Sequence, residues 1–168
     1  MNRWDCVTEL APIIEREVAT AAALLDALLR EKKALAGSDA VALAETTDRK
    51  NAALTALEVA ETERRRVLQR FNLGSPPGDM QVLIEKCAIE KVTTPAAISI
   101  ASNWKQLRTS LLHCRDANLT NGQIVATMQR RVQQALNLLR GGRGEVATYG
   151  RTGSTQLTGA GARELARA

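Results

Sequence analysis

The histidine and the three cysteines are the side chains of this chain best suited to nucleophilic or metal chemistry. His113 directly precedes Cys114, but neighbouring residues point to different sides of a helix and do not form a catalytic pair. Cys6, Cys87 and Cys114 have no C-x-x-C spacing, and a hydrolytic triad or a zinc site needs further partners. We therefore expect no enzyme, no metal and no cofactor, and a surface position for His113 rather than a catalytic one.

Clustered charges and glycines offer little more chemistry. The run Arg64 to Arg66 is interpreted either as a solvated helix face or as an anion site, whereas Glu61 with Arg65 and Glu15 with Glu17 are interpreted as solvated faces. The chain has no G-x-G-x-x-G or P-loop pattern for phosphate. Its net charge of +5 is spread along the chain, so we do not expect binding to nucleic acid.

An unusual polar element runs from Asn118 to Gly122 within an otherwise apolar helical pattern. Asn118 and Asn121 stand at positions that the pattern reserves for apolar side chains, and Gly122 disfavours a helix. Two interpretations are open. In the first, the amides are buried and bonded so that they fix the register of the helices. In the second, the element is a weakened region where a partner docks or the helix bends.

Helices must position these residues, because the composition disfavours sheets. Ala and Leu, which are strong helix formers, occupy 48 of 168 positions, and aromatic residues make up 2% of the chain. The sequence therefore predicts an all-α fold: an elongated antiparallel hairpin or coiled-coil bundle of three long helices and a short one, with a flexible C-terminal tail.

The first two helices are predicted to form the hairpin. Apolar residues at steps of three and four run from Trp4 to Leu35, and Pro12 predicts either a kink or the true start of this helix. Gly37 suits the left-handed position that ends a helix, and either Ser38 or Asp39 can cap the next one, over 39–72. The seam expected in the second helix is Leu43, Leu54, Leu57, Leu68 and Phe71, with help from Ala53, Ala60 and Val67.

Two further helices complete the predicted domain of residues 1–140. Asp79 is expected to cap a short helix over 80–91, and Thr94 with Pro95 to begin the longest helix, which continues to about residue 140. Its seam is Ile100, Trp104, Leu107, Leu111, Cys114, Asn118, Asn121, Val125, Met128, Val132, Ala135 and Leu139. Trp4 and Trp104 are expected in the core rather than as binding anchors.

The remaining residues, 141–168, are rich in glycine and poor in large apolar side chains. Such a segment buries too little apolar area to offset the entropy of ordering it. We therefore expect a flexible tail as a separate region, in which Tyr149 is the only aromatic residue.

Essentially the whole chain resembles the FlgN family of flagellar export chaperones, and the specific part of the resemblance runs from Trp104 to Gly153. The shared pattern is a Trp, here Trp104, then Cys-x-x-x-Asn-x-x-Asn-Gly-x-Ile from Cys114 to Ile124, Gln-Ala-Leu-x-x-Leu-x-Gly from Gln134 to Gly141, and Tyr149-Gly150 with Gly153. The resemblance implies a cytoplasmic chaperone that binds the amphipathic C-terminal helices of hook-associated proteins. It would prevent their premature assembly and deliver them to the type III export gate.

The residues suggest where these partners would bind. An amphipathic helix can lie in an apolar groove of a bundle, and the candidate groove residues are Val125, Met128, Val132, Leu136 and Leu139. Tyr149 and Gly150 are the candidates for docking to the export gate, because an isolated Tyr suits a partner's pocket; the alternative is that Tyr149 packs on the end of the bundle.

A structural coiled-coil scaffold without a role in export is the competing interpretation, since the apolar seam fits it equally well. No run of apolar residues is long enough to span a membrane, and Asp5 and Glu9 precede the first apolar stretch, unlike a secretory signal. We therefore expect no membrane insertion. The sequence leaves the oligomeric state open, including a homo-oligomer.

Overall fold

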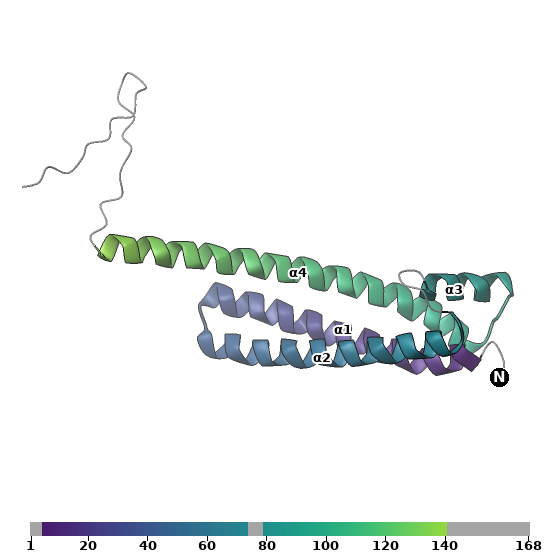
Figure 1. The fold of residues 1–168 in the computed structure, drawn as a ribbon. Helices are drawn as coiled ribbons and strands as arrows, with labels where there is room; N and C mark the ends of the chain where they lie inside the picture. The colour runs from purple at the N-terminus through teal and green to yellow at the C-terminus, as the bar shows by residue number, and fades with distance from the viewer. Residues whose placement is uncertain (1–4, 74–78, 141–168) are drawn as a thin grey trace, which may run out of the picture. The chain divides into compact units, whose positions relative to one another are not determined.

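Four α-helices account for nearly all of the chain that the structure, a computed structural model, describes: residues 5–73 and 79–140. These ranges contain no strand, which confirms the predicted all-α fold of three long helices and a short one (Figure 1). The helices are α1 (Asp5–Gly37), α2 (Ala40–Arg70), α3 (Asp79–Ile89) and α4 (Pro95–Leu139).

The chain divides into two units, and the boundary falls inside α4. Residues 1–126 form the first unit, and residues 127–168 the second. Within the second unit the structure describes the end of α4, to residue 140. The predicted division into a bundle over 1–140 and a tail over 141–168 stays a prediction, because the tail lies outside the described residues.

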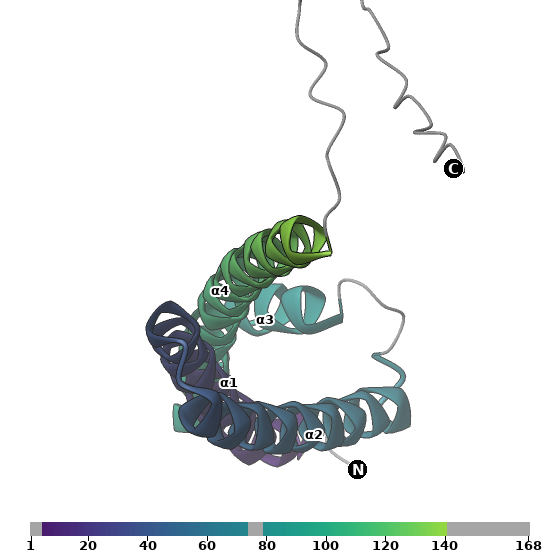
Figure 2. The ribbon, with the colours of Figure 1, turned by 90° about the vertical axis from the view of Figure 1, so that its left-hand side faces the viewer.

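A tight turn joins α1 to α2, and the two helices lie side by side in opposite directions (Figures 1 and 2). The backbone N–H groups of Ser38 and Asp39 donate to the carbonyls of Leu35 and Ala34 at 3.2 and 3.0 Å, the pattern of a Schellman motif. Gly37 was expected in the left-handed position, but it is the last helical residue and Ser38 adopts φ 53° instead.

Asp39, rather than Ser38, caps α2. Its carboxylate accepts hydrogen bonds from the backbone N–H groups of Val41 and Ala42 at 3.1 and 3.0 Å, which satisfies two donors that a helix start leaves free. At the other end of the hairpin α1 begins at Asp5, so Pro12 lies inside the helix and does not start it. Pro12 is exposed, as is Thr8, whose carbonyl lacks the usual donor there.

Small side chains form the buried seam of α2. Thr46, Ala53, Ala60 and Val67 are buried and recur every seven residues, so α1 and α2 can approach closely. The prediction for Leu54 was wrong, because this side chain is 40% exposed. Its neighbour Ala53 takes the inward position, and Leu68 is buried as expected.

The start of α4 confirms the predicted cap. Pro95 is the first helical residue, and the hydroxyl of Thr94 accepts a hydrogen bond from the backbone N–H of Ala97 at 3.3 Å. Before it, α3 packs Met80, Leu83 and Cys87 into the larger of two apolar clusters, together with residues near the start of α1, the end of α2 and the start of α4.

Within the first unit, α4 runs parallel to α1 and in register with it. The thiol of Cys114 meets the carbonyl of Ala21 at 3.5 Å, and the amide of Asn121 meets the carbonyl of Leu28 at 2.9 Å; both pairs are 93 residues apart. One heptad on α4 therefore matches one heptad on α1, as coiled-coil packing requires. Of the helices described, none is both long and apolar enough to cross a membrane.

Candidate functional site

The buried face of α4 is narrower than its apolar pattern predicts. Ile100, Leu107, Cys114 and Asn121, at intervals of seven, are buried. The intervening seam residues are less covered: Trp104 is half-buried, and Leu111, Asn118 and Val125 are exposed. No described residue of α4 after Asn121 is buried. Apart from Ala97 near the start of the helix, the buried residues of α4 therefore form a single row, and that row ends at Asn121.

Asn121 connects α4 to the hairpin by hydrogen bonds. It is 3% exposed, and its amide nitrogen donates to the carbonyl oxygen of Leu28 at 2.9 Å and to Oε2 of Glu31 at 2.7 Å. The other carboxylate oxygen of Glu31 accepts from Nζ of Lys50 at 2.5 Å. A chain of polar groups thus joins α4, α1 and α2, and its geometry favours the register-fixing interpretation for Asn121.

The other members of the Asn118–Gly122 element are not part of this network. Asn118 is exposed, so the prediction of two buried amides is wrong for this residue. Gly122 is exposed as well, and beyond its chain neighbours and the adjacent backbone of α4 no atom lies within 4 Å of the position that a Cβ would occupy. The packing does not require glycine there, and the helix continues through it.

A second polar link joins α1 to α2 farther from the turn of the hairpin than the pair of Glu31 and Lys50. Glu17 was expected on a solvated face, but it is 1% exposed, and Nε of Arg64 lies 3.0 Å from both of its carboxylate oxygens. Burial raises the pKa of Glu17 above its usual range, and the Arg64 guanidinium offsets part of that effect. Arg64 also lies over the ring of Trp104, 5.0 Å from its centroid.

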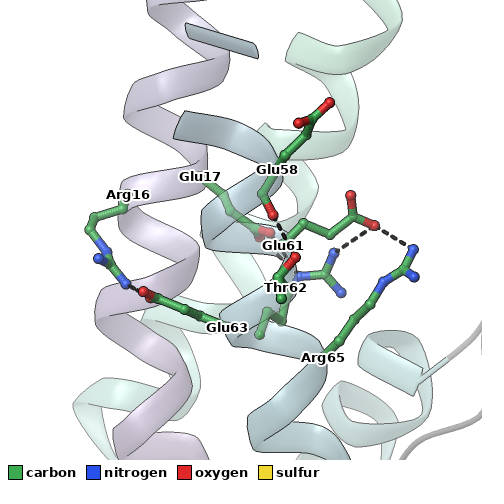
Figure 3. A network of polar contacts seen from close by, with 8 residues as sticks. Arg16, Glu17, Glu58, Glu61, Thr62, Glu63 and Arg65 are labelled. Carbon is green, nitrogen blue, oxygen red and sulfur yellow. Dashed lines mark hydrogen bonds and ion pairs between the residues drawn. The ribbon is translucent and has the colours of Figure 1, made fainter. Parts of the chain in front are cut away.

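Arg64 therefore fits neither of the two interpretations given to the arginine run, since its nearest partners are a buried carboxylate and an aromatic ring. It also forms a longer ion pair with Glu61, at 3.9 Å. Around it, exposed pairs line the hairpin (Figure 3). Arg65 pairs with Glu61 at 2.6 Å, as expected of a solvated face, and Arg16 of α1 pairs with Glu63 of α2. Such exposed pairs contribute little to stability individually.

The three cysteines lie in buried positions where their thiols are unreactive. Burial raises the pKa of the thiols of Cys6, Cys87 and Cys114 above the usual value of 9.0, which keeps them protonated and unreactive near neutral pH. His113 is exposed, as predicted. The described residues contain no group of three or more His, Cys, Asp or Glu side chains that could hold a metal ion.

The described end of α4 carries the predicted binding residues on its surface. Met128 is half-buried, and Val132, Leu136 and Leu139 are 59%, 38% and 84% exposed. They recur at steps of four and three, which places them on one face of the helix. Leu138, 76% exposed, was not predicted. Val125, the fifth predicted residue, belongs to the first unit and is 37% exposed.

Three residues singled out in the sequence lie outside the described ranges: Trp4, Tyr149 and Gly150. The predictions made for them, a core position for Trp4 and docking for Tyr149 and Gly150, stay predictions. Trp104 packs against the larger apolar cluster, as expected of a core residue, although it is only half-buried.

The described residues thus form a bundle of long helices that buried polar pairs and apolar clusters hold together. A family model described as FlgN protein matches residues 1–156, and the chain therefore belongs to the FlgN family of flagellar export chaperones, which is not a family of enzymes. Neither the curated proteins nor the solved structures contain a significant match to this chain.

Proposed function

We propose that this flagellar export chaperone acts in the cytoplasm, binds the amphipathic C-terminal helices of hook-associated proteins and delivers them to the type III export gate. The observation that carries the proposal is the exposed apolar face of α4 formed by Met128, Val132, Leu136 and Leu139. Water is a poor solvent for such a face, and an amphipathic helix that covers it gains the free energy of apolar burial.

The chemistry of this face suits a chaperone. A client covered by it could not use the same amphipathic helix to assemble early. Met128 is unbranched and adapts its shape, so the face can accommodate clients whose side chains differ in size. The step requires no nucleotide, because the free energy of association is sufficient to hold the client until a competing partner displaces it.

Substitutions within α4 test client binding. We expect Val132→Ser with Leu136→Ser to weaken binding of a C-terminal hook-associated peptide by at least roughly tenfold, since each lost aliphatic contact costs about 1 kcal/mol. Isothermal titration calorimetry with the full chain measures this. The control is Val41→Ser, because Val41 is a 73% exposed apolar residue on α2. Equal affinity for the double variant and the control would overturn the assignment of this face.

Docking to the export gate is proposed for Tyr149 and Gly150. We expect Tyr149→Ala to weaken binding of the client-loaded chaperone to the cytoplasmic part of the gate, and Tyr149→Phe to retain most of it if the ring fills a pocket. Unchanged affinity for the Ala variant would leave Tyr149 without this role. A chain that oligomerises but binds neither peptide nor gate would favour the scaffold interpretation.

A further inference from the structure

The structure contains a groove between α3 and α4 that the proposed client face does not include. It has a volume of about 330 Å³ and lies wholly within the first unit. Its apolar walls are formed by Ile84 of α3 and by Trp104 and Leu112 of α4, and Lys105 and Arg108 of α4 stand beside them. The remaining lining residues are Gln81, Ala101 and Thr109, so no carboxylate is among the described residues that line the groove. The nearby carboxylate of Glu85 accepts a hydrogen bond from Gln81 at 2.9 Å.

The two cations of this groove have no acidic partner within residues 5–73 and 79–140. Lys105 and Arg108 are exposed and form no ion pair with any described residue. By contrast Arg16, Arg65 and Arg70, on α1 and α2, each pair with a carboxylate. Across α4 as a whole there are five basic residues and one acidic residue, Asp116. The groove therefore presents uncompensated positive charge next to apolar surface.

Trp104 gives the groove a fixed aromatic anchor. Arg64 of α2 lies over its ring, and the same arginine is held by the buried carboxylate of Glu17. A ring restrained in this way loses little entropy when a partner covers it. Trp and Arg are also the residues that contribute most often to the energetic centres of protein interfaces.

The groove continues a site that already holds a helix. Residues of α3, among them Leu83 and Cys87, lie against Ala97 and Ile100 at the start of α4, and the groove extends this surface along α4 to Leu112. Leu112 is 59% exposed, and Leu119, seven residues further on the same face, is 55% exposed. The spacing fits the apolar positions of a helix laid along α4.

We propose that this α3–α4 groove binds an acidic amphipathic helix of a partner protein. The apolar side of the partner helix covers Ile84, Trp104 and Leu112, and its carboxylates meet Lys105 and Arg108. A polyanion without an apolar side is a poorer match, because it would leave the apolar walls uncovered and meet only two cations. The proposal concerns a surface separate from the client face and does not depend on it.

A designed peptide tests the proposal with the full chain. The probe is a fluorescein-labelled helix of about 16 residues with Leu at steps of three and four and Glu beside them; a matched peptide carries Lys in place of Glu. We expect the Glu peptide to bind at least tenfold more tightly than the Lys peptide in fluorescence anisotropy. Equal binding of the two peptides, or none, would overturn the proposal.

Charge reversal in the chain locates the site. We expect Lys105→Glu with Arg108→Glu to weaken binding of the Glu peptide at least tenfold, and Leu112→Ser to weaken it several-fold. Lys32→Glu with Lys33→Glu is the control, because both lysines are exposed on α1 and the change in net charge is identical. The control should change the affinity for the Glu peptide less than twofold. If the control lost as much affinity as the Lys105→Glu, Arg108→Glu chain, the peptide would be held only by long-range attraction to the net charge, and the proposal would be overturned.

A competition experiment separates protein helices from other anions. We expect neither a 20-nucleotide single-stranded DNA nor vesicles of phosphatidylserine and phosphatidylcholine to displace the Glu peptide at 150 mM salt. If either one displaces the peptide, and its own direct binding is lost in the Lys105→Glu, Arg108→Glu chain, the groove belongs to that anion and the proposal is overturned. Circular dichroism should show unchanged helix content for all variants, because the substituted side chains are exposed.

Discussion

The amide nitrogen of Asn121 lies 2.7 Å from a carboxylate oxygen of Glu31, which precedes it by 90 residues in the chain. This contact stands at the end of the buried row of α4, because no described residue of the helix beyond Asn121 is buried. The Asn121–Glu31 hydrogen bond is therefore made by the last buried residue of α4 that the structure describes, and it is polar rather than apolar.

Removing this amide should destabilise the first unit measurably. We expect Asn121→Ala to lower the free energy of unfolding by about 1–2 kcal/mol, because two hydrogen bonds are lost and Glu31 keeps only Lys50. Asn121→Asp should cost more, since a second carboxylate would face Glu31. Urea unfolding followed by circular dichroism measures both. Asn118→Ala is the control and should stay within about 0.5 kcal/mol, because Asn118 is exposed.

Arg64 should matter far more than its neighbour Arg66. We expect Arg64→Ala to lower the free energy of unfolding by about 3–5 kcal/mol, because it leaves the buried carboxylate of Glu17 without a partner. Arg66→Ala, an exposed change two residues away, should be nearly neutral. The double variant Glu17→Leu with Arg64→Leu should recover much of the loss. Comparable effects of Arg64→Ala and Arg66→Ala in urea unfolding would contradict this account.

The stability should depend on pH through Glu17. Because its pKa is raised in the folded state from the ordinary value of 4.5, the folded chain binds more protons than the unfolded chain at pH values between the two pKa values. The contribution of Glu17 to the free energy of unfolding is therefore complete below about pH 4.5, and it is lost as the pH rises through the pKa that Glu17 has in the folded state. Glu17→Gln should remove this component, so unfolding free energies measured from pH 4 to 7 should differ in slope between the two chains.

Gly122 should be replaceable in the fold. It lies inside α4, and beyond its chain neighbours and the adjacent backbone of the helix no atom lies within 4 Å of an added Cβ. We therefore expect Gly122→Ala to raise the free energy of unfolding by roughly 0.5–1 kcal/mol, because alanine has the higher helix propensity. Thermal unfolding measures the change. A loss of stability would mean that the helix needs glycine, and weaker client binding in the stabilised chain would give Gly122 a role in function.

Local signals in the sequence predicted the elements well. Thr94 followed by Pro95 predicted the start of α4, and Asp39 was one of the two caps foreseen for α2, because capping depends on residues only a few positions apart. The end of α1 differed by one residue. Gly37 is still helical, so the left-handed position falls on the next residue, Ser38.

Burial depended on distant partners and was harder to predict. Asn118 and Asn121 look equivalent in the pattern, but only Asn121 meets Leu28 and Glu31. In the sequence Glu17 cannot be distinguished from a surface carboxylate, because its partner Arg64 lies 47 residues later in the chain. For the candidate client face the steps of three and four placed the residues on one side of the helix, while their exposure required the structure.

The separations between contacting residues imply an order of folding. Glu31 and Lys50 are 19 residues apart, Glu17 and Arg64 are 47 apart, and the contacts of α4 with α1 span 93 residues. Loop closure costs more entropy as the separation grows, so the hairpin can close from its turn while the ribosome is still adding α4. Until Cys114 and Asn121 have been synthesised, the face of α1 that they cover stays open.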